Sequence, residues 1–151
     1  MTTRTRTAAV DGWFTMDGDE PALLGQRCTT CGTFFFPRAS VCCRNPHCTG
    51  TEYTDVPLSR RGKVWSYTDA RYQPPPPYVV PAGGHQPFAI AAVELAEEGL
   101  VVLGQVVHGV GVDELAVGME VEVVLDTLFT DDDHEYVVWK WKPVATDREA
   151  R

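Results

Sequence analysis

The sequence predicts a mainly β protein made of a small N-terminal ribbon followed by a five-stranded barrel. Two observations predict this fold. All five cysteines of the 151-residue chain fall within the 21 residues from Cys28 to Cys48. After them come five apolar or alternating segments, separated by turns rich in proline, glycine or acidic residues. The composition, 44% hydrophobic and 23% charged, is typical of a folded globular domain and not of a disordered chain.

The cysteines predict a metal site. Cys28 and Cys31 are separated by two residues, eleven residues follow, and four residues then separate Cys43 from Cys48. An odd, clustered set without a secretory signal indicates metal binding rather than disulfides. Four thiolates suit a tetrahedral Zn²⁺ and leave no open position for chemistry. An iron site of the rubredoxin type is disfavoured, because its second pair of cysteines normally has two intervening residues. We predict one structural zinc with these ligands: Cys28, Cys31, Cys43 and Cys48, with Cys42 as the alternative third ligand.

The ribbon is expected over residues 22–57, with strands at 22–27, 33–36 and 51–56. In this arrangement Cys42 fills space inside the ribbon as a small apolar side chain. About 35 residues bury too little surface to fold alone, so the metal must supply much of the ribbon's stability. Residues 1–21 form a polar N-terminal segment, whose end at 17–21 is either a turn or the end of a short helix.

The barrel is expected over residues 58–143, and residues 144–151 are expected to be a flexible tail. Its order predicts an OB fold: three strands, a short helical turn, then two more strands. The overall prediction is thus a rubredoxin-like zinc ribbon followed by a five-stranded OB-fold barrel. The predicted elements are strands at 61–72, 88–95 and 100–107, a helical turn at 113–116, and strands at 119–125 and 135–142.

The distribution of charge argues against nucleic-acid binding, a function that the fold alone would suggest. Residues 91–139 contain twelve acidic residues and no lysine or arginine. A nucleic-acid-binding protein needs a basic surface to neutralise phosphates. We therefore expect no nucleic-acid partner. No segment has the apolar length of a membrane span, so we expect no membrane partner and a cytoplasmic location.

The sequence also lacks a catalytic motif. It has no nucleophile elbow, no phosphate-binding glycine loop and no pair of histidines spaced for a metal, and its four histidines are far apart. We do not expect catalysis by this chain alone. Aromatic and proline residues gather instead on the first barrel strand and the loop after it, as a docking surface would require.

Taken together, the motifs resemble one family over roughly residues 12–143. They are the cysteine ribbon with Phe36-Pro-Arg after its first turn, Cys43-Arg-Asn-Pro-His-Cys48, Gly62-Lys-Val-Trp-Ser-Tyr-Thr68, a Pro-Pro-Tyr loop, and Asp113-Glu-Leu-Ala-Val-Gly-Met-Glu-Val121. The chain is identified as similar to the zinc-ribbon/OB-fold acyl-CoA-associated proteins, formerly a domain of unknown function. Members of this family are partner subunits of thiolase-like aldolases, thiolases and MaoC-type enoyl-CoA hydratases.

The resemblance implies a non-catalytic accessory subunit of an acyl-CoA aldolase (lyase) or thiolase complex. Such a subunit docks on a thiolase-fold enzyme, stabilises or activates it, and contributes to its acyl-CoA channel. It implies a role in lipid metabolism, in the degradation of steroid side chains or other bulky acyl-CoA substrates. It also implies a heterotetramer built on a dimeric partner. The residues expected to contact the partner or the acyl channel are Phe35, Phe36, Trp65, Tyr67, Tyr72, Pro75 and Tyr78.

Two other functions remain open at this stage. A stand-alone acyl-CoA carrier would need cations for the coenzyme's phosphates, and the candidates are Arg60, Arg61 and Lys63. A single-stranded nucleic-acid binder would use the OB barrel, but the acidic second half of the chain argues against it. The acyl-CoA substrate, the kind of partner enzyme and the choice between Cys42 and Cys43 stay undetermined.

Overall fold

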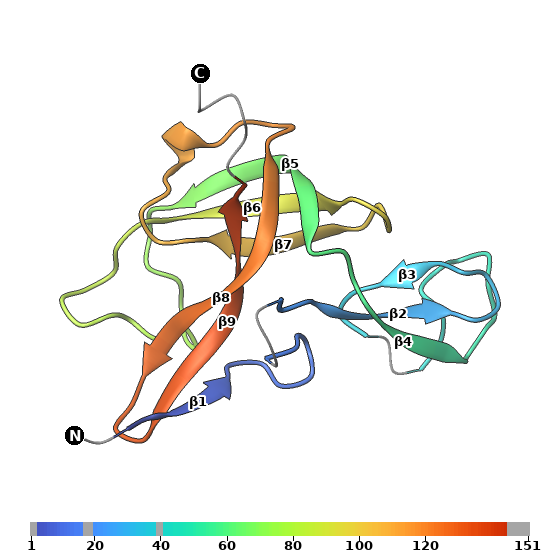
Figure 1. Ribbon diagram of the computed structural model, residues 1–151, viewed down its shortest axis with the longest axis horizontal. Helices are drawn as coiled ribbons and strands as arrows, with labels where there is room; N and C mark the ends of the chain where they lie inside the picture. The colour runs from blue at the N-terminus through green and yellow to red at the C-terminus, as the bar shows by residue number, and fades with distance from the viewer. Residues whose placement is uncertain (1–2, 17–19, 39–40, 145–151) are drawn as a thin grey trace.

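The computed structural model describes residues 3–16, 20–38 and 41–144. Its strands form two bodies, a small three-stranded ribbon on one side and a barrel on the other (Figure 1). This is the mainly β arrangement that the sequence predicts. Residues 145–151, where a flexible tail is expected, lie outside the described residues. Within the described residues, no helix is long and apolar enough to cross a membrane.

The barrel consists of five strands and closes on itself. Its strands are β5 (Arg61–Ala70), β6 (Phe88–Leu95), β7 (Val101–Val106), β8 (Glu120–Thr130) and β9 (His134–Pro143), with a single 3₁₀ turn, η1 (Val112–Glu114), before β8. They pair in the order β5-β6-β7-β9-β8, and β8 returns to β5. The β7–β9 pair is parallel and the others are antiparallel. This order confirms the predicted OB fold.

Small and large side chains alternate across the barrel core. Ala89 and Ala91 of β6 point inward, while β9 contributes the large indoles of Trp139 and Trp141. Gly104 of β7 lies against both indoles: a Cβ at this position would be 2.7 Å from Trp139 Nε1 and 2.8 Å from Trp141 Nε1. Glycine is therefore required by close packing on this strand.

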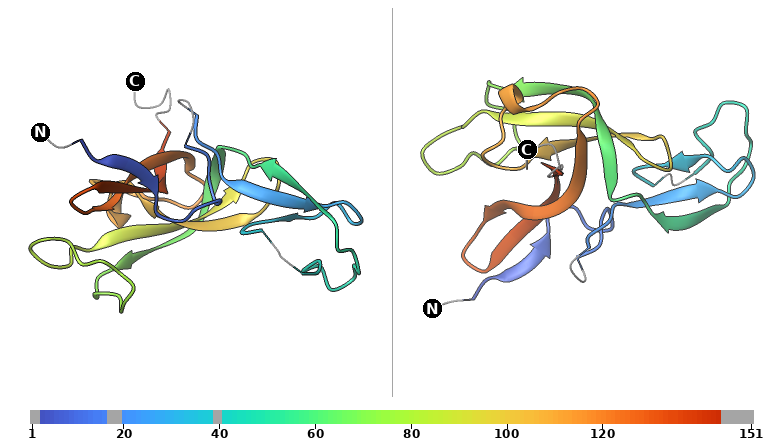
Figure 2. Two further views of the ribbon diagram at one scale, coloured as in Figure 1. Left: turned by 90° about the horizontal axis from the view of Figure 1, so that it is seen from below. Right: turned by 45° about the horizontal axis from the view of Figure 1, so that its top comes forward.

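The ribbon is a three-stranded antiparallel sheet. It consists of β2 (Leu24–Cys28), β3 (Phe34–Phe35) and β4 (Tyr53–Pro57), with β2 in the centre. All three strands lie within a few residues of their predicted positions. A short turn at residues 29–33 connects β2 to β3, and the connection from β3 to β4 is longer. The ribbon projects to one side of the barrel in both views of Figure 2.

The ribbon and the barrel share one hydrophobic core. Leu23 and Leu58, which flank the ribbon, are buried together with the barrel residues. At the same junction, Trp13 stacks on Trp139 at 5.8 Å between ring centroids, and Phe36 contacts both rings edge-on at 5.4 and 5.7 Å. These contacts fix the ribbon relative to the barrel, because moving it would expose aromatic surface.

A polar clamp supports the same junction. The carboxylate of Glu98, in the β6–β7 turn, accepts hydrogen bonds from the Ser59 backbone N–H at 3.0 and 3.1 Å and from the Ser59 hydroxyl. Ser59 lies between the last ribbon strand and the first barrel strand. A charged acceptor thus holds the connection between the two bodies.

The N-terminal segment contains a β-strand, whereas the sequence analysis considered a short helix there. β1 (Thr5–Ala8) pairs in parallel with the outer part of β9 and extends the barrel sheet. Phe14 then forms a β-bridge with Leu23. Thr5 and Thr7 favour extended backbone, and β9 offers an unpaired edge at this point. Residues 17–19, where the helix was expected to end, lie outside the described residues.

Candidate metal centre and partner surface

Four cysteines converge at the end of the ribbon. The Sγ atoms of Cys28, Cys31, Cys43 and Cys48 all lie within 4.8 Å of one another. Cys28 Sγ is 3.8 Å from Cys48 Sγ, and Cys31 Sγ is 3.7 Å from Cys43 Sγ. A tetrahedral ion with metal–sulfur bonds of about 2.3 Å separates its sulfurs by about 3.8 Å. The four cysteines are therefore positioned to bind one zinc ion. Among residues 3–16, 20–38 and 41–144, no other group of cysteines, histidines or carboxylates comes together in this way.

Two tight turns aim the thiol groups at one point. In the first, Gly32 N–H donates to the Cys28 carbonyl at 2.9 Å, and Gly32 has the positive φ of +75° that favours glycine. In the second, Cys48 N–H donates to the Asn45 carbonyl at 3.0 Å. A further bond of 3.0 Å from Cys43 N–H to the Gly50 carbonyl closes the base of this second loop.

The thiol groups differ in their readiness to ionise. Hydrogen bonds from the Thr33 hydroxyl and backbone favour the Cys31 thiolate and lower its pKa to about 6. The backbone N–H of Cys31 lowers the pKa of Cys28. Burial instead raises the pKa of Cys43 to about 12. Because zinc binds thiolates, it must displace the proton of Cys43.

Two arginines place positive charge beside the cysteine cluster. The Arg27 guanidinium lies 5.4 Å from the centre of the Phe34 ring, and its Nε donates to the Gly32 carbonyl at 3.2 Å. The Arg44 guanidinium lies 5.8 Å from the centre of the Phe35 ring. A zinc ion with four thiolates carries a net charge of −2, which these cations partly offset.

The structure separates Cys42 from the cluster. Cys43 is buried and its sulfur belongs to the group of four, whereas Cys42 is exposed and outside it. The prediction that Cys42 fills space inside the ribbon as a small apolar side chain is therefore wrong. His47, which precedes Cys48 in the second turn, is exposed.

The residues predicted to contact a partner divide into two groups. Phe35 is buried against Cys28 and Cys43, and Phe36 packs between Trp13 and Trp139. Both rings help to hold the ribbon and its junction together, and Phe35 is buried whereas Phe36 is half-buried. The remaining residues lie at the surface: Trp65, Tyr67, Tyr72 and Pro75 are exposed, and Tyr78 is half-buried.

An apolar surface that the sequence did not reveal adjoins Trp65. Leu103 of β7 pairs with Ala92 of β6, which pairs with Ser66, next to Trp65 at a β-bulge. Trp65 is 60% exposed and Leu103 is 65% exposed. Val101 is also exposed on the same face of β7, while Val102 between them is buried. We call Trp65, Ala92, Val101 and Leu103 the outer apolar band.

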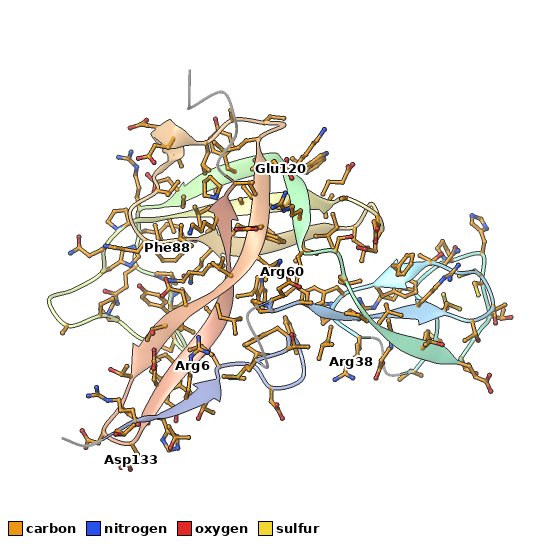
Figure 3. All side chains as sticks on the ribbon, viewed as in Figure 1. Arg6, Arg38, Arg60, Phe88, Glu120 and Asp133 are labelled. Atoms are coloured by element: carbon orange, nitrogen blue, oxygen red, sulfur yellow. The ribbon has the colours of Figure 1, made fainter. Side chains whose placement is uncertain are left out.

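The cations proposed for coenzyme A phosphates are largely engaged elsewhere. Arg60 Nε donates to the Pro21 carbonyl at 2.9 Å, and its guanidinium lies 3.8 Å from Glu20 (Figure 3). Arg61 lies between Glu120 and Glu122, at 3.3 and 3.8 Å. Lys63 is exposed on the same strand. Two of the three cations are thus already paired with carboxylates, which weakens the case for a stand-alone acyl-CoA carrier.

Family models match both parts of the chain. Residues 17–54 match the ChsH2 rubredoxin-like zinc ribbon domain, and residues 55–126 match the ChsH2 C-terminal OB-fold domain. A solved structure described as an Ltp2-ChsH2(DUF35) aldolase is similar, with a TM-score of 0.59 and 30% sequence identity. That similarity covers 81% of this chain and 84% of the other.

Curated relatives extend the comparison. A DUF35 domain-containing scaffold protein of Methanocaldococcus jannaschii is 34% identical over 81% of this chain and 82% of its own length. The benzoylsuccinyl-CoA thiolase subunit BbsA of Geobacter metallireducens is 34% identical over 85% of this chain and 80% of its own length. A probable enoyl-CoA hydratase alpha subunit of Thermomonospora curvata is 31% identical over 85% of this chain, which matches only 35% of that longer protein.

Proposed function

Because this chain belongs to the DUF35 family, with a ChsH2-type zinc ribbon and OB fold, we propose that it is a non-catalytic accessory subunit of a thiolase-fold acyl-CoA enzyme. The partner is a thiolase or an aldolase, and it carries out the carbon–carbon chemistry. The observation that carries this proposal is the joint match of ribbon and barrel to subunits of a thiolase and of an aldolase complex.

The metal centre supports a structural role. The four sulfurs of Cys28, Cys31, Cys43 and Cys48 would fill all four positions of a tetrahedral ion and leave none for substrate or water. The ion would instead fix the loops around Cys31 and Cys43, which the small ribbon core alone holds weakly. A ribbon that is rigid and joined to the barrel through Phe36 and Trp139 presents one fixed shape to a partner.

The outer apolar band supports docking. Trp65 and Leu103 expose most of their surface on a face of the barrel that no other described segment covers. Tyr72 on the β5–β6 loop, at 76% exposure, is a further aromatic side chain at the surface. Exposed aromatic and aliphatic side chains grouped on a rigid sheet are typical of the centre of a protein interface.

The finer assignment follows from the family. We propose that docking stabilises or activates the partner, and that Tyr72, Pro75 and Tyr78 lie at the entrance of its acyl-CoA channel. A bulky acyl chain, such as a steroid side chain, is the proposed substrate class, and a cytoplasmic heterotetramer on a dimeric partner is the proposed assembly. A MaoC-type hydratase is the second candidate partner, favoured by the similarity to a hydratase subunit.

Co-expression tests the proposal. A tagged form of this chain is produced with a candidate thiolase-fold enzyme from the same genome, and activity toward acyl-CoA substrates is measured with and without this chain. We expect the two proteins to co-purify in equal amounts and the pair to be more active than the enzyme alone. Full activity of the enzyme alone, with no co-purification, would contradict the proposal.

A further inference from the structure

A cleft of about 870 Å³ lies at the end of the barrel away from the ribbon. Three segments that are distant in sequence line it: the β5–β6 loop at residues 71–87, the β7–β8 connection at 107–113, and the outer part of β8 at 126–129. Figure 1 shows these segments on the side of the barrel opposite the ribbon. Phe88, at the start of β6, lines it beside the loop (Figure 3). The volume falls within the range of small-molecule sites in proteins.

The apolar wall of this cleft is preorganised. Tyr78 stacks on Phe88, with 6.4 Å between ring centroids, and its hydroxyl lies 3.0 Å from His85 Nδ1. His85 Nε2 lies 2.9 Å from the Ala70 carbonyl at the end of β5. The imidazole therefore ties the far side of the loop to the barrel. Prolines in the loop restrict it further, so binding costs little ordering of the protein.

A buried lysine lies in the cleft. Lys140 of β9 is only 8% exposed, and its ammonium group contacts Asp126 Oδ2 at 3.2 Å. An ammonium group has three N–H donors, and Asp126 is the acceptor that the described residues provide. The other N–H groups of the Lys140 ammonium can donate to an oxygen atom of a molecule bound in the cleft.

The charges around the cleft disfavour an anionic ligand. Lys140 is paired with Asp126, and Arg71 is paired with Asp69 at 2.7 Å. Asp113 adds a further negative charge to the lining. A phosphate or carboxylate would therefore meet no unpaired cation in the cleft.

We propose that this cleft binds an uncharged, mostly apolar molecule, through a carbonyl or hydroxyl oxygen that accepts a hydrogen bond from Lys140. The apolar part lies against the wall formed by Tyr78, Phe88 and the valines of the β7–β8 connection. The site is made by this chain alone and does not depend on a partner enzyme.

Fluorescence titration of the full chain tests the site. Nile red, an uncharged dye with a carbonyl group, is the probe, and the anionic dye 1-anilinonaphthalene-8-sulfonate is the comparison. Val79→Asp places a charge on the cleft lining, and Val117→Asp is the matched control on an exposed valine outside it. We expect saturable binding of one Nile red, weakened about tenfold or more by Val79→Asp and unchanged by Val117→Asp. The anionic dye should bind at least tenfold more weakly than Nile red.

The role of Lys140 is tested with a second dye. Lys140→Met keeps the apolar stem but removes the donor, and diphenylhexatriene is an apolar probe without an acceptor. We expect the substitution to weaken Nile red about tenfold and to leave diphenylhexatriene unchanged. If Lys140→Met weakens the binding of both dyes equally, or of neither dye, the proposed hydrogen bond is contradicted. Equal effects of Val79→Asp and Val117→Asp, or tighter binding of the anionic dye, overturn the site itself without touching the proposed docking function.

Discussion

Trp65→Ala is expected to weaken the complex with the thiolase-fold partner without weakening the fold. A tryptophan side chain presents at most about 250 Å², and Trp65 is 60% exposed, which leaves about 150 Å² for a partner to cover. At about 25 cal/mol per Å², full burial contributes at most about 4 kcal/mol. Ordering and desolvation costs reduce this value, so we expect a loss of about 2 kcal/mol, or about 30-fold in Kd.

The assay is a titration of the purified subunit into its partner by isothermal calorimetry, with thermal unfolding of the free subunit in parallel. Val117→Ala is the control, because Val117 is 70% exposed but lies outside the outer apolar band. It should leave Kd unchanged. A Trp65→Ala subunit that binds as tightly as wild type would refute the assignment of this band to the interface.

Three further predictions concern the metal and the core. Cys42→Ser should keep one zinc per chain while Cys43→Ser loses it, as measured by elemental analysis; equal zinc loss in both would contradict the ligand assignment. Zinc binding should release more protons as the pH falls from 8 to 5.5. Burial raises the pKa of Cys43 to about 12, so this thiol is protonated and loses a proton to zinc throughout the range. Cys31, with a pKa of about 6, is protonated only at the acid end and adds to the release there. Calorimetry in buffers of different ionisation enthalpy measures this release, and a constant value would be contrary to expectation. Gly104→Ala should lower the free energy of unfolding by about 1–3 kcal/mol in urea titrations, because the added methyl group would collide with two indole rings. A variant as stable as the wild type would show that the barrel core can rearrange to accept the methyl group.

Local signals in the sequence were sufficient for most of the fold. The cysteine spacing placed the two metal-binding turns, and the turn at Glu97–Gly99 placed the β6–β7 hairpin. β1 was missed because its pairing with β9 joins residues about 130 positions apart, and four residues carry no pattern that predicts such a partner. β8 extends to Thr130, beyond its predicted end at 125, because it continues into an outward hairpin with β9.

The surface was harder to predict because hydrophobicity alone does not say which face of a strand is covered. Val101, Val102 and Leu103 are equally apolar, yet only Val102 points into the barrel. Phe35, which was expected to contact a partner, is buried in the ribbon, whereas Phe36 packs at the junction and stays half-buried. Lys140 carries no sequence signal for burial other than its position between two core tryptophans, and its place in the cleft depends on loops from elsewhere in the chain.

The most direct test of the account is to measure zinc content and partner binding in the same samples. Native mass spectrometry of the co-purified complex should show one zinc ion for each copy of this chain. Removal of that ion with a strong chelator should release the partner, and added zinc should restore the complex. A metal-free chain that binds the partner as tightly as the zinc-loaded chain would contradict the claim that the metal-fixed ribbon is what makes this protein a docking subunit.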